Sequence, residues 1–183
     1  MSPPLSDPTR AERFSALYES AHSDVLRFVQ RRAGPDAAED ITHEAFLVAW
    51  RRFEDAPAGR SDARAWLFGI ARNCLLSDQR GQVRRGALGI RIAADTTTAV
   101  DAEDDLSALR LDLKSAWQKL RPDQQEILSL AIWDELDSTH AGQVLGITAA
   151  SYRIRLHRAR AALRRLLDAT PFSAPAAVLT ASE

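Results

Sequence analysis

The stretch SYRIRLHRARAALRRLL, residues 151–167, carries six arginines and no acidic residue. Its apolar residues recur at the i, i+4, i+7 spacing of a helix that packs on a core. These residues are Tyr152, Leu156, Ala159, Leu163 and Leu167. The opposite face carries Ser151, Arg153, Ile154, His157 and Arg158. Because clustered like charges repel each other unless a polyanion neutralises them, the stretch predicts a helix that faces DNA.

A shorter helix, over about 137–145, is expected directly before this stretch. Gly146 suits the position that follows a helix, and Thr148 suits the N-cap of the next one. Two helices joined by such a tight turn form a helix-turn-helix, whose second helix reads the major groove. Ile154 has no folding role on an exposed face, whereas a thymine methyl group would suit it.

Composition sets the class of protein. A chain of 183 residues holds one medium domain or two small ones, and 45% hydrophobic residues is typical of a globular fold. Neither a membrane-spanning run nor a signal peptide is expected. The single cysteine, Cys74, excludes an internal disulfide framework and fits a reducing cytoplasm; we expect it to be a buried apolar residue.

The net charge of −1 hides a sharp partition along the chain. Residues 60–91 contain seven arginines and two acids, residues 94–112 are acidic, and residues 148–166 are basic again. Arginine suits bidentate contacts to phosphate and guanine. Two basic units with an acidic spacer between them are therefore expected to bind nucleic acid.

Helical periodicity dominates and predicts an all-α protein with two small helical domains. In the first domain we expect helices from about Thr9 to Arg32, from about 37 to 53 with Asp36 as N-cap, and from the N-cap Ser61 to about Arg80. In the second we expect helices over about 106–120 and 122–133, followed by the helix-turn-helix. The predicted boundaries are 9–85 for the first domain, 86–105 for a flexible linker, 106–168 for the second domain and 169–183 for a disordered tail.

Two further helix faces are candidates for binding. The second helix turns Asp40, His43, Glu44, Leu47 and Trp50 away from its buried stripe. Apolar side chains set among acids indicate a protein-docking face, although Trp50 could equally cover the edge of the core. The third helix presents Arg72, Asn73, Gln79 and Arg80, a polar and basic set that suits a phosphate backbone or a single strand.

Catalysis is not predicted. An acid three residues before His43 has the spacing of a helical metal site, but such a site needs a second copy of the motif, and the sequence has none. A phosphate-binding glycine loop and a nucleophile with a supporting base are also missing. We therefore expect a binding protein without a catalytic site, metal, cofactor or small-molecule substrate.

The motifs DAAEDITHEAFLVAW (36–50) and ARAWLFGIARN (63–73) resemble region 2 of the extracytoplasmic-function (ECF) sigma factors of bacterial RNA polymerase. The segment from Leu120 to Leu167 resembles their region 4. This resemblance implies an alternative sigma factor that binds core polymerase and directs promoter-specific initiation. It further implies a cytoplasmic protein, associated with the nucleoid through polymerase, and the possibility of control by an anti-sigma factor.

The resemblance also implies a role for each face. The docking face of the second helix would bind the clamp helices of the largest polymerase subunit, and region 4 would meet the flap of the second-largest subunit. Arg72, Asn73, Gln79 and Arg80 would capture the −10 element, with a flipped base held by the loop around 55–61. Ser151, Arg153, Ile154, His157 and Arg158 would occupy the −35 major groove.

The chain departs from the family pattern in two segments. The loop reads APAG where many members have an aromatic residue, and THAGQVLGI (139–147) replaces a bulkier sequence. We expect the glycine at 142 to cost helix stability and Tyr152 to fill the space left by Ala141 and Gly142. The rival interpretations are a free-standing helix-turn-helix regulator, which should dimerise on paired half-sites, and a helical adaptor that binds no DNA.

Overall fold

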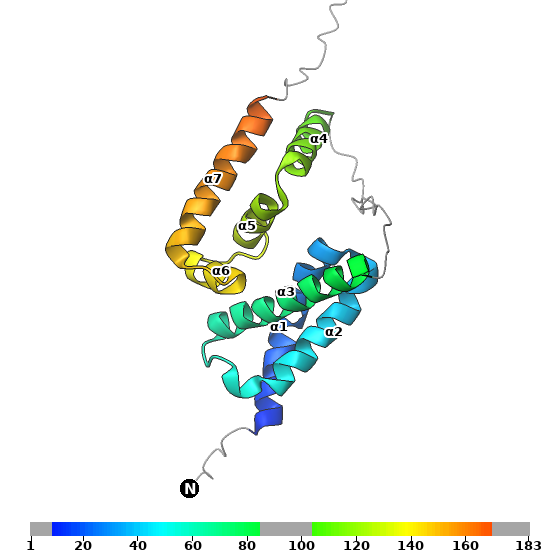
Figure 1. Ribbon diagram of the computed structural model, residues 1–183, viewed down its shortest axis with the longest axis vertical. Helices are drawn as coiled ribbons and strands as arrows, with labels where there is room; N and C mark the ends of the chain where they lie inside the picture. The colour runs from blue at the N-terminus through cyan, green and yellow to red at the C-terminus, as the bar shows by residue number, and fades with distance from the viewer. Residues whose placement is uncertain (1–8, 85–103, 170–183) are drawn as a thin grey trace, which may run out of the picture.

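The computed structural model describes residues 9–84 and 104–169, which form two helical bundles (Figure 1). The N-terminal bundle contains α1 (Arg10–Ala33), α2 (Pro35–Arg51), the short 3-10 helix η1 (Phe53–Asp55) and α3 (Arg60–Arg84). The C-terminal bundle contains α4 (Asp104–Lys119), α5 (Pro122–Ile132), α6 (Ser138–Leu145) and α7 (Ala149–Asp168). Strands are absent from these described residues, so the all-α prediction is confirmed. The predicted linker and tail lie mostly outside the described residues.

Helix boundaries follow the local signals with two corrections. Thr9, where the first helix was expected to begin, is its N-cap and forms a capping box with Glu12. The second helix begins at Pro35, so Asp36 lies inside its first turn and is not the N-cap. Proline suits the first helical position because the N–H that it lacks would have no helical partner there. The third helix begins at Arg60, which places Ser61 inside it and corrects the expected cap.

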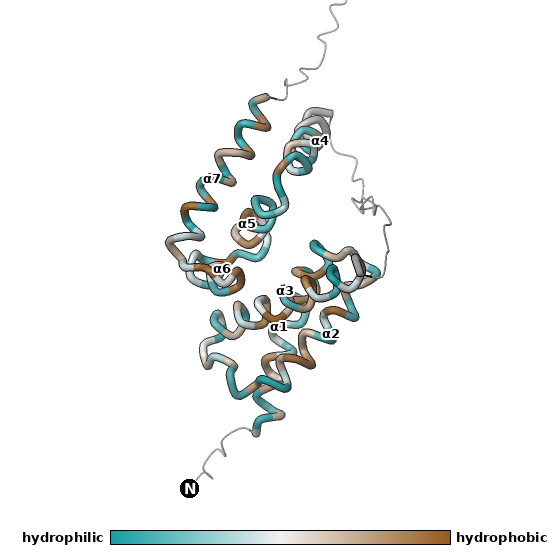
Figure 2. Tube along the Cα trace, in the orientation of Figure 1, coloured by the Kyte–Doolittle hydropathy of each residue, from teal (hydrophilic) through white to brown (hydrophobic). Residues whose placement is uncertain are grey.

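The core of the N-terminal bundle is formed by the predicted stripes of its helices. Leu67, Ile70, Ala71, Cys74 and Leu75 are all buried. Phe68 is fully buried and stacks on Phe28, with ring centroids 4.6 Å apart. Hydrophobic and hydrophilic residues are interspersed along the helices of both bundles (Figure 2).

The helix-turn-helix has the expected caps. Gly146 adopts the left-handed conformation with φ of 67° after α6, and the Thr148 hydroxyl accepts a hydrogen bond from the Ser151 amide at the start of α7. A Cβ atom at Gly142 would come within 2.7 Å of the Ile147 carbonyl oxygen. The absence of a side chain at 142 is therefore what allows the turn to pack closely against α6.

At Gly142 the atoms nearest to a Cβ are backbone atoms of residues 147–149. The expected filling of this space by Tyr152 stays a prediction. Tyr152 is buried and its hydroxyl donates a 2.9 Å hydrogen bond to the Ile127 carbonyl in α5. Burial raises the pKa of its phenol to about 12. Tyr152 therefore joins α7 to α5.

Asp137 caps α6, and its removal should destabilise the helix-turn-helix. Its carboxylate accepts hydrogen bonds from the amides of Thr139 and His140, at 2.8 and 2.9 Å. We expect Asp137→Ala to lower the free energy of unfolding by about 1 kcal/mol and Asp137→Asn, which keeps an acceptor, to change it little. Denaturant unfolding of the three proteins measures both effects; equal losses in the two variants would contradict the capping role.

The stability that the Asp137 cap contributes should fall as the pH is lowered. The His140 amide holds the pKa of Asp137 below its ordinary value, with further help from the Thr139 amide. A carboxyl whose pKa is lower in the folded state stabilises it above the unfolded-state pKa, and this contribution is lost as the pH falls through the folded-state pKa. The stability difference between wild type and Asp137→Ala should therefore shrink in acid.

The two bundles pack directly on each other. Helix α6 lies against α3, and the buried apolar side chains of both bundles form one continuous cluster (Figure 1). Ion pairs also cross the contact between α1 or α3 and the C-terminal bundle. The sequence predicted two domains but gave no indication of this contact between them.

Candidate polymerase and nucleic-acid interfaces

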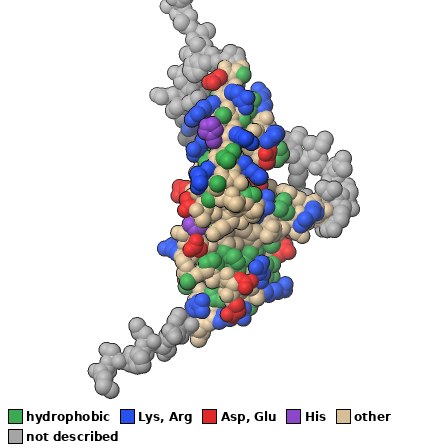
Figure 3. Space-filling view, turned by 60° about the vertical axis from the view of Figure 1, so that its left-hand side comes forward, with side chains coloured by type: hydrophobic (Ala, Val, Ile, Leu, Met, Phe, Trp, Pro, Cys, Tyr) green, Lys and Arg blue, Asp and Glu red, His purple; other side chains and the backbone are tan. Residues whose placement is uncertain are grey.

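The outer face of α7 is basic and solvent-accessible. Arg153, Ile154, His157 and Arg158 are exposed, and Ile154 is 54% exposed. Basic side chains crowd over the part of the surface that α7 forms (Figure 3). Ser151 is half-buried, and its hydroxyl accepts a hydrogen bond from that of Thr148 at 3.0 Å. Ser151 thus belongs to the helix cap as well as to the predicted −35 set.

A hollow beside this face extends the positive surface toward α5. Arg155 and Arg158 from α7 line it together with Arg121, the residue before α5. Asp123 is paired with Arg121 at 2.9 Å, and both side chains are largely exposed. Arg155 is exposed. Three guanidinium groups at one hollow suit the phosphates that flank a major-groove contact.

The face of α2 that was expected to bind protein is accessible to solvent. Asp40, His43, Glu44, Leu47 and Trp50 all point to solvent, while Ile41, Ala45 and Ala49 are buried and Val48 is half-buried. Leu47 is 57% exposed and Trp50 is 37% exposed.

Trp50 covers the edge of the core and keeps part of its surface exposed. Its ring packs edge-on against Phe14 at 5.0 Å, and the Arg10 guanidinium lies over it at 4.5 Å. The rest of the ring is accessible. Leu47 is therefore the more open apolar contact on this face, and Trp50 is partly a core-edge residue.

The polar face of α3 is divided. Asn73, Gln79 and Arg80 are exposed, as expected for residues that contact nucleic acid. Arg72 is half-buried and forms a two-pronged ion pair with Glu126 of α5, with N–O distances of 2.7 and 3.2 Å. In this conformation one residue of the predicted −10 set is tied to the other bundle. The loop between η1 and α3 is mostly exposed.

The single cysteine and the acidic and histidine side chains are candidates for reactive or metal-binding arrangements among the described residues. Burial, with a smaller effect of Glu44, raises the pKa of the Cys74 thiol to about 11, so it stays protonated at neutral pH. Over residues 9–84 and 104–169, no three His, Cys, Asp or Glu side chains gather as metal ligands. In the same ranges, no helix is both long and apolar enough to cross a membrane.

Comparisons with known proteins match both bundles. The Sigma-70 region 2 model matches residues 17–85, and the Sigma-70, region 4 model matches residues 110–163. The ECF RNA polymerase sigma factor SigC of Mycobacterium tuberculosis is 32% identical over 161 residues, which cover 85% of this chain and 83% of SigC. The chain belongs to the ECF sigma factors. A free-standing helix-turn-helix regulator is not favoured, because the region 2 match accounts for most of the N-terminal bundle.

Other relatives support the same family. SigL of M. tuberculosis is 29% identical over 155 residues, covering 84% of this chain and 88% of SigL. The solved structure of sigma factor RpoE with the anti-sigma factor NepR, from Bartonella quintana, has a TM-score of 0.63 and 25% identity, covering 86% of this chain and 98% of RpoE. CnrH, solved with the cytosolic domain of CnrY, has the same fold, with a TM-score of 0.56 and 23% identity over 90% of this chain and 92% of CnrH.

The ECF protein is therefore an alternative sigma factor: it binds core RNA polymerase and promoter DNA and directs transcription initiation. It is not an enzyme, because polymerase performs the chemistry. Sequence reasoning missed the residues that join the bundles, above all Asp134, since an isolated acid after a helix carries no distinctive signal.

Proposed function

We propose that three helix faces of the sigma factor each bind a different partner: core polymerase, the −10 element and the −35 element. The exposed face of α2, Asp40 to Trp50, docks on the clamp helices of the largest polymerase subunit. The face of α3 that carries Asn73, Gln79, Arg80 and, once its ion pair opens, Arg72 captures the −10 element. The outer face of α7, from Ser151 to Arg158, reads the −35 element in the major groove.

The exposure of Ile154 among arginines carries this assignment. Ile154 is 54% exposed on a basic face, so its side chain contributes little to the folded core. It can instead contact a thymine methyl group while neighbouring arginines bind guanine or phosphate. Leu47 is the equivalent observation for the polymerase face, because an exposed leucine between Glu44 and Trp50 fits the apolar centre of a protein interface.

The C-terminal bundle offers a second polymerase contact. Ile132 and Trp133 are both about half exposed at the end of α5. This apolar pair fits the flap of the second-largest subunit. RpoE was solved with the anti-sigma factor NepR, so we also propose that an anti-sigma factor regulates this chain. Binding to polymerase would place the protein on the nucleoid.

Run-off transcription with purified core polymerase tests the proposal. We expect the ECF protein to yield transcripts with defined 5′ ends from promoters selected out of a random library, and these promoters should share two elements. Transcripts with random 5′ ends would contradict the proposed function. If the selected promoters shared only one element, the assignment of the −10 element to α3 and the −35 element to α7 would be contradicted.

A further inference from the structure

A hollow of about 250 Å³ lies between α1 and α2, two helices that pack side by side (Figure 1). The described residues that line it come from both helices: Tyr18, His22 and Leu26 from α1, and Glu39, Thr42 and His43 from α2. His43 also belongs to the exposed face of α2 that we propose to dock on polymerase. The hollow is therefore continuous with that face.

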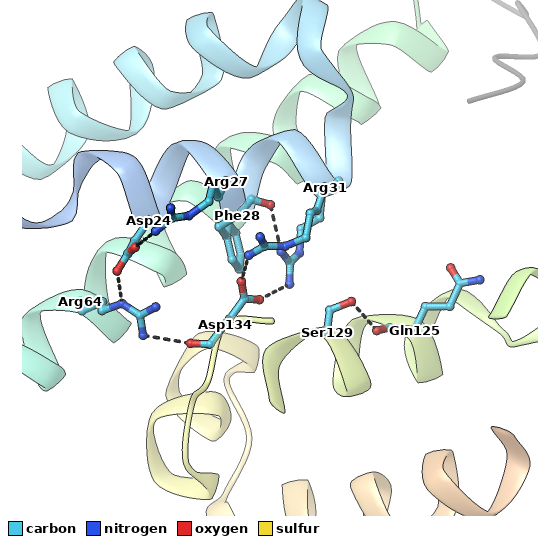
Figure 4. A network of polar contacts seen from close by, with 9 residues as sticks. Asp24, Arg27, Phe28, Arg31, Arg64, Gln125, Ser129 and Asp134 are labelled. Carbon is cyan, nitrogen blue, oxygen red and sulfur yellow. Dashed lines mark hydrogen bonds and ion pairs between the residues drawn. The ribbon is translucent and has the colours of Figure 1, made fainter. Parts of the chain in front are cut away.

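Thr42 is a buried polar residue whose hydroxyl has no hydrogen-bond partner among the described residues. A helical threonine can donate to the carbonyl four residues back, but Thr42 does not. Ser129 and Asp134, the other buried polar or charged residues of the described ranges, are both partnered. The Ser129 hydroxyl donates to the Gln125 carbonyl at 2.7 Å, and Asp134 accepts from Arg32 at 2.8 Å (Figure 4). Because an unpaired buried hydroxyl is unfavourable, we expect the Thr42 oxygen to receive a partner from outside the chain.

The groups around the hollow suit a guanidinium. The Glu39 side chain is exposed, and no ion pair joins it to another described residue. Tyr18 and His22 supply aromatic rings, with centroids 4.9 Å apart. A guanidinium forms ion pairs with a carboxylate, stacks on aromatic rings and donates hydrogen bonds to a hydroxyl oxygen. All three kinds of group line this one hollow.

The charge of the surroundings also favours a cation from a partner. Lysine and arginine are absent from the described residues that line the hollow. Asp40 and Glu44 extend the negative charge along the exposed face of α2. A metal ion is a poorer fit, because the histidines and Glu39 do not gather as three metal ligands in the described ranges.

We propose that this hollow is a pocket for one arginine side chain of the polymerase clamp helices. The guanidinium pairs with Glu39, stacks on the ring of Tyr18 and donates a hydrogen bond to Thr42 Oγ1. An arginine that fills a desolvated pocket is among the strongest contributors to a protein interface. This inference rests on the proposed docking of α2 on the clamp helices. It adds a polar contact to the apolar contact of Leu47.

Thr42→Val tests the pocket, because valine has nearly the shape of threonine and lacks the hydroxyl. We expect the denaturant midpoint of the free full-length protein to stay unchanged or to rise, since the removed hydroxyl has no partner there. The dissociation constant for core polymerase should increase about tenfold, because a hydrogen bond to a charged group is lost. A lower midpoint, or an unchanged dissociation constant, would contradict the proposed role of Thr42.

Glu39→Gln tests the charge of the pocket. It should also weaken binding of core polymerase about tenfold, since the guanidinium loses its ion pair. Glu19→Gln is the matched control: it removes the same charge from an exposed position on α1 outside the hollow, so the dissociation constant should not change. Equal losses in the two variants would show a general effect of charge and overturn the pocket.

The partner arginine can be identified by combining these variants with single arginine-to-alanine substitutions in the clamp helices. One such substitution should weaken binding of the wild-type sigma factor and abolish the further effects of Glu39→Gln and Thr42→Val, because all three changes remove the same contact. Additive effects with every clamp arginine would contradict the proposal.

Leu47→Asp separates this inference from the proposed function. If Leu47→Asp weakens binding of core polymerase and the two pocket variants do not, the arginine pocket is overturned and the docking of α2 stands. If neither Leu47→Asp nor the pocket variants weaken binding, the docking of α2 itself is wrong.

Discussion

Replacing Leu47 with aspartate should weaken the binding of core polymerase by a factor of about 30 or more and leave the fold intact. Leu47 is 57% exposed on α2, so the folded ECF protein loses little when it becomes polar. In the complex, the new carboxylate would be desolvated without a partner. A loss of about 2 kcal/mol, typical of an interface hot spot, corresponds to that factor.

Leu111→Asp is the matched control for this variant. Leu111 is 64% exposed on α4 and belongs to none of the proposed faces. Its replacement should leave the dissociation constant for core polymerase, measured by fluorescence anisotropy, unchanged. Equal losses in the two variants, or no loss in Leu47→Asp, would show that α2 is not the docking helix. Trp50 is a poorer choice, because its contact with Phe14 couples binding to stability.

Replacing Arg158 with alanine should reduce transcription from promoters that depend on the −35 element by about 5- to 150-fold. This range corresponds to the loss of about 1–3 kcal/mol for one bidentate arginine contact to a base. Arg158 is exposed on α7 beside Arg155 and Arg121 and has no structural ion pair that its removal would break. Binding of core polymerase should stay at the wild-type value.

Arg164→Ala separates base reading from phosphate binding. Arg164 is exposed farther along α7, outside the proposed reading face. Its loss should weaken binding to all promoters by a similar factor and preserve the preferred −35 sequence, whereas Arg158→Ala should relax that sequence. If Arg158→Ala reduced polymerase binding and transcription equally, the assignment of Arg158 to the DNA face would be wrong.

Local signals in the sequence predicted most of the helical architecture. The N-cap Thr148 and the turn glycine at 146 depend on neighbours within a few residues, so their patterns are visible in the chain. The start of α2 was placed two residues late because Asp36 was taken as the N-cap, although proline at 35 suits the first turn of a helix.

The long-range contacts were not predictable in this way. The pairing of Asp134 with arginines of α1 joins residues more than 100 positions apart, and no periodicity marks either partner. The need for glycine at 142 depends on where the backbone of residue 147 returns, which only the folded turn fixes. For the same reason, Arg72 was assigned to DNA without any sign of its pairing with Glu126.

Tethered cleavage of promoter DNA tests most directly whether α3 and α7 read the two elements. Cys74 is buried and its thiol is protonated at neutral pH, so an iron chelate would attach to a cysteine introduced by Gln79→Cys or His157→Cys. In complexes with core polymerase, we predict cleavage around the −10 element from position 79 and around the −35 element from position 157. Cleavage at one shared position from both, or in the reverse order, would contradict this account.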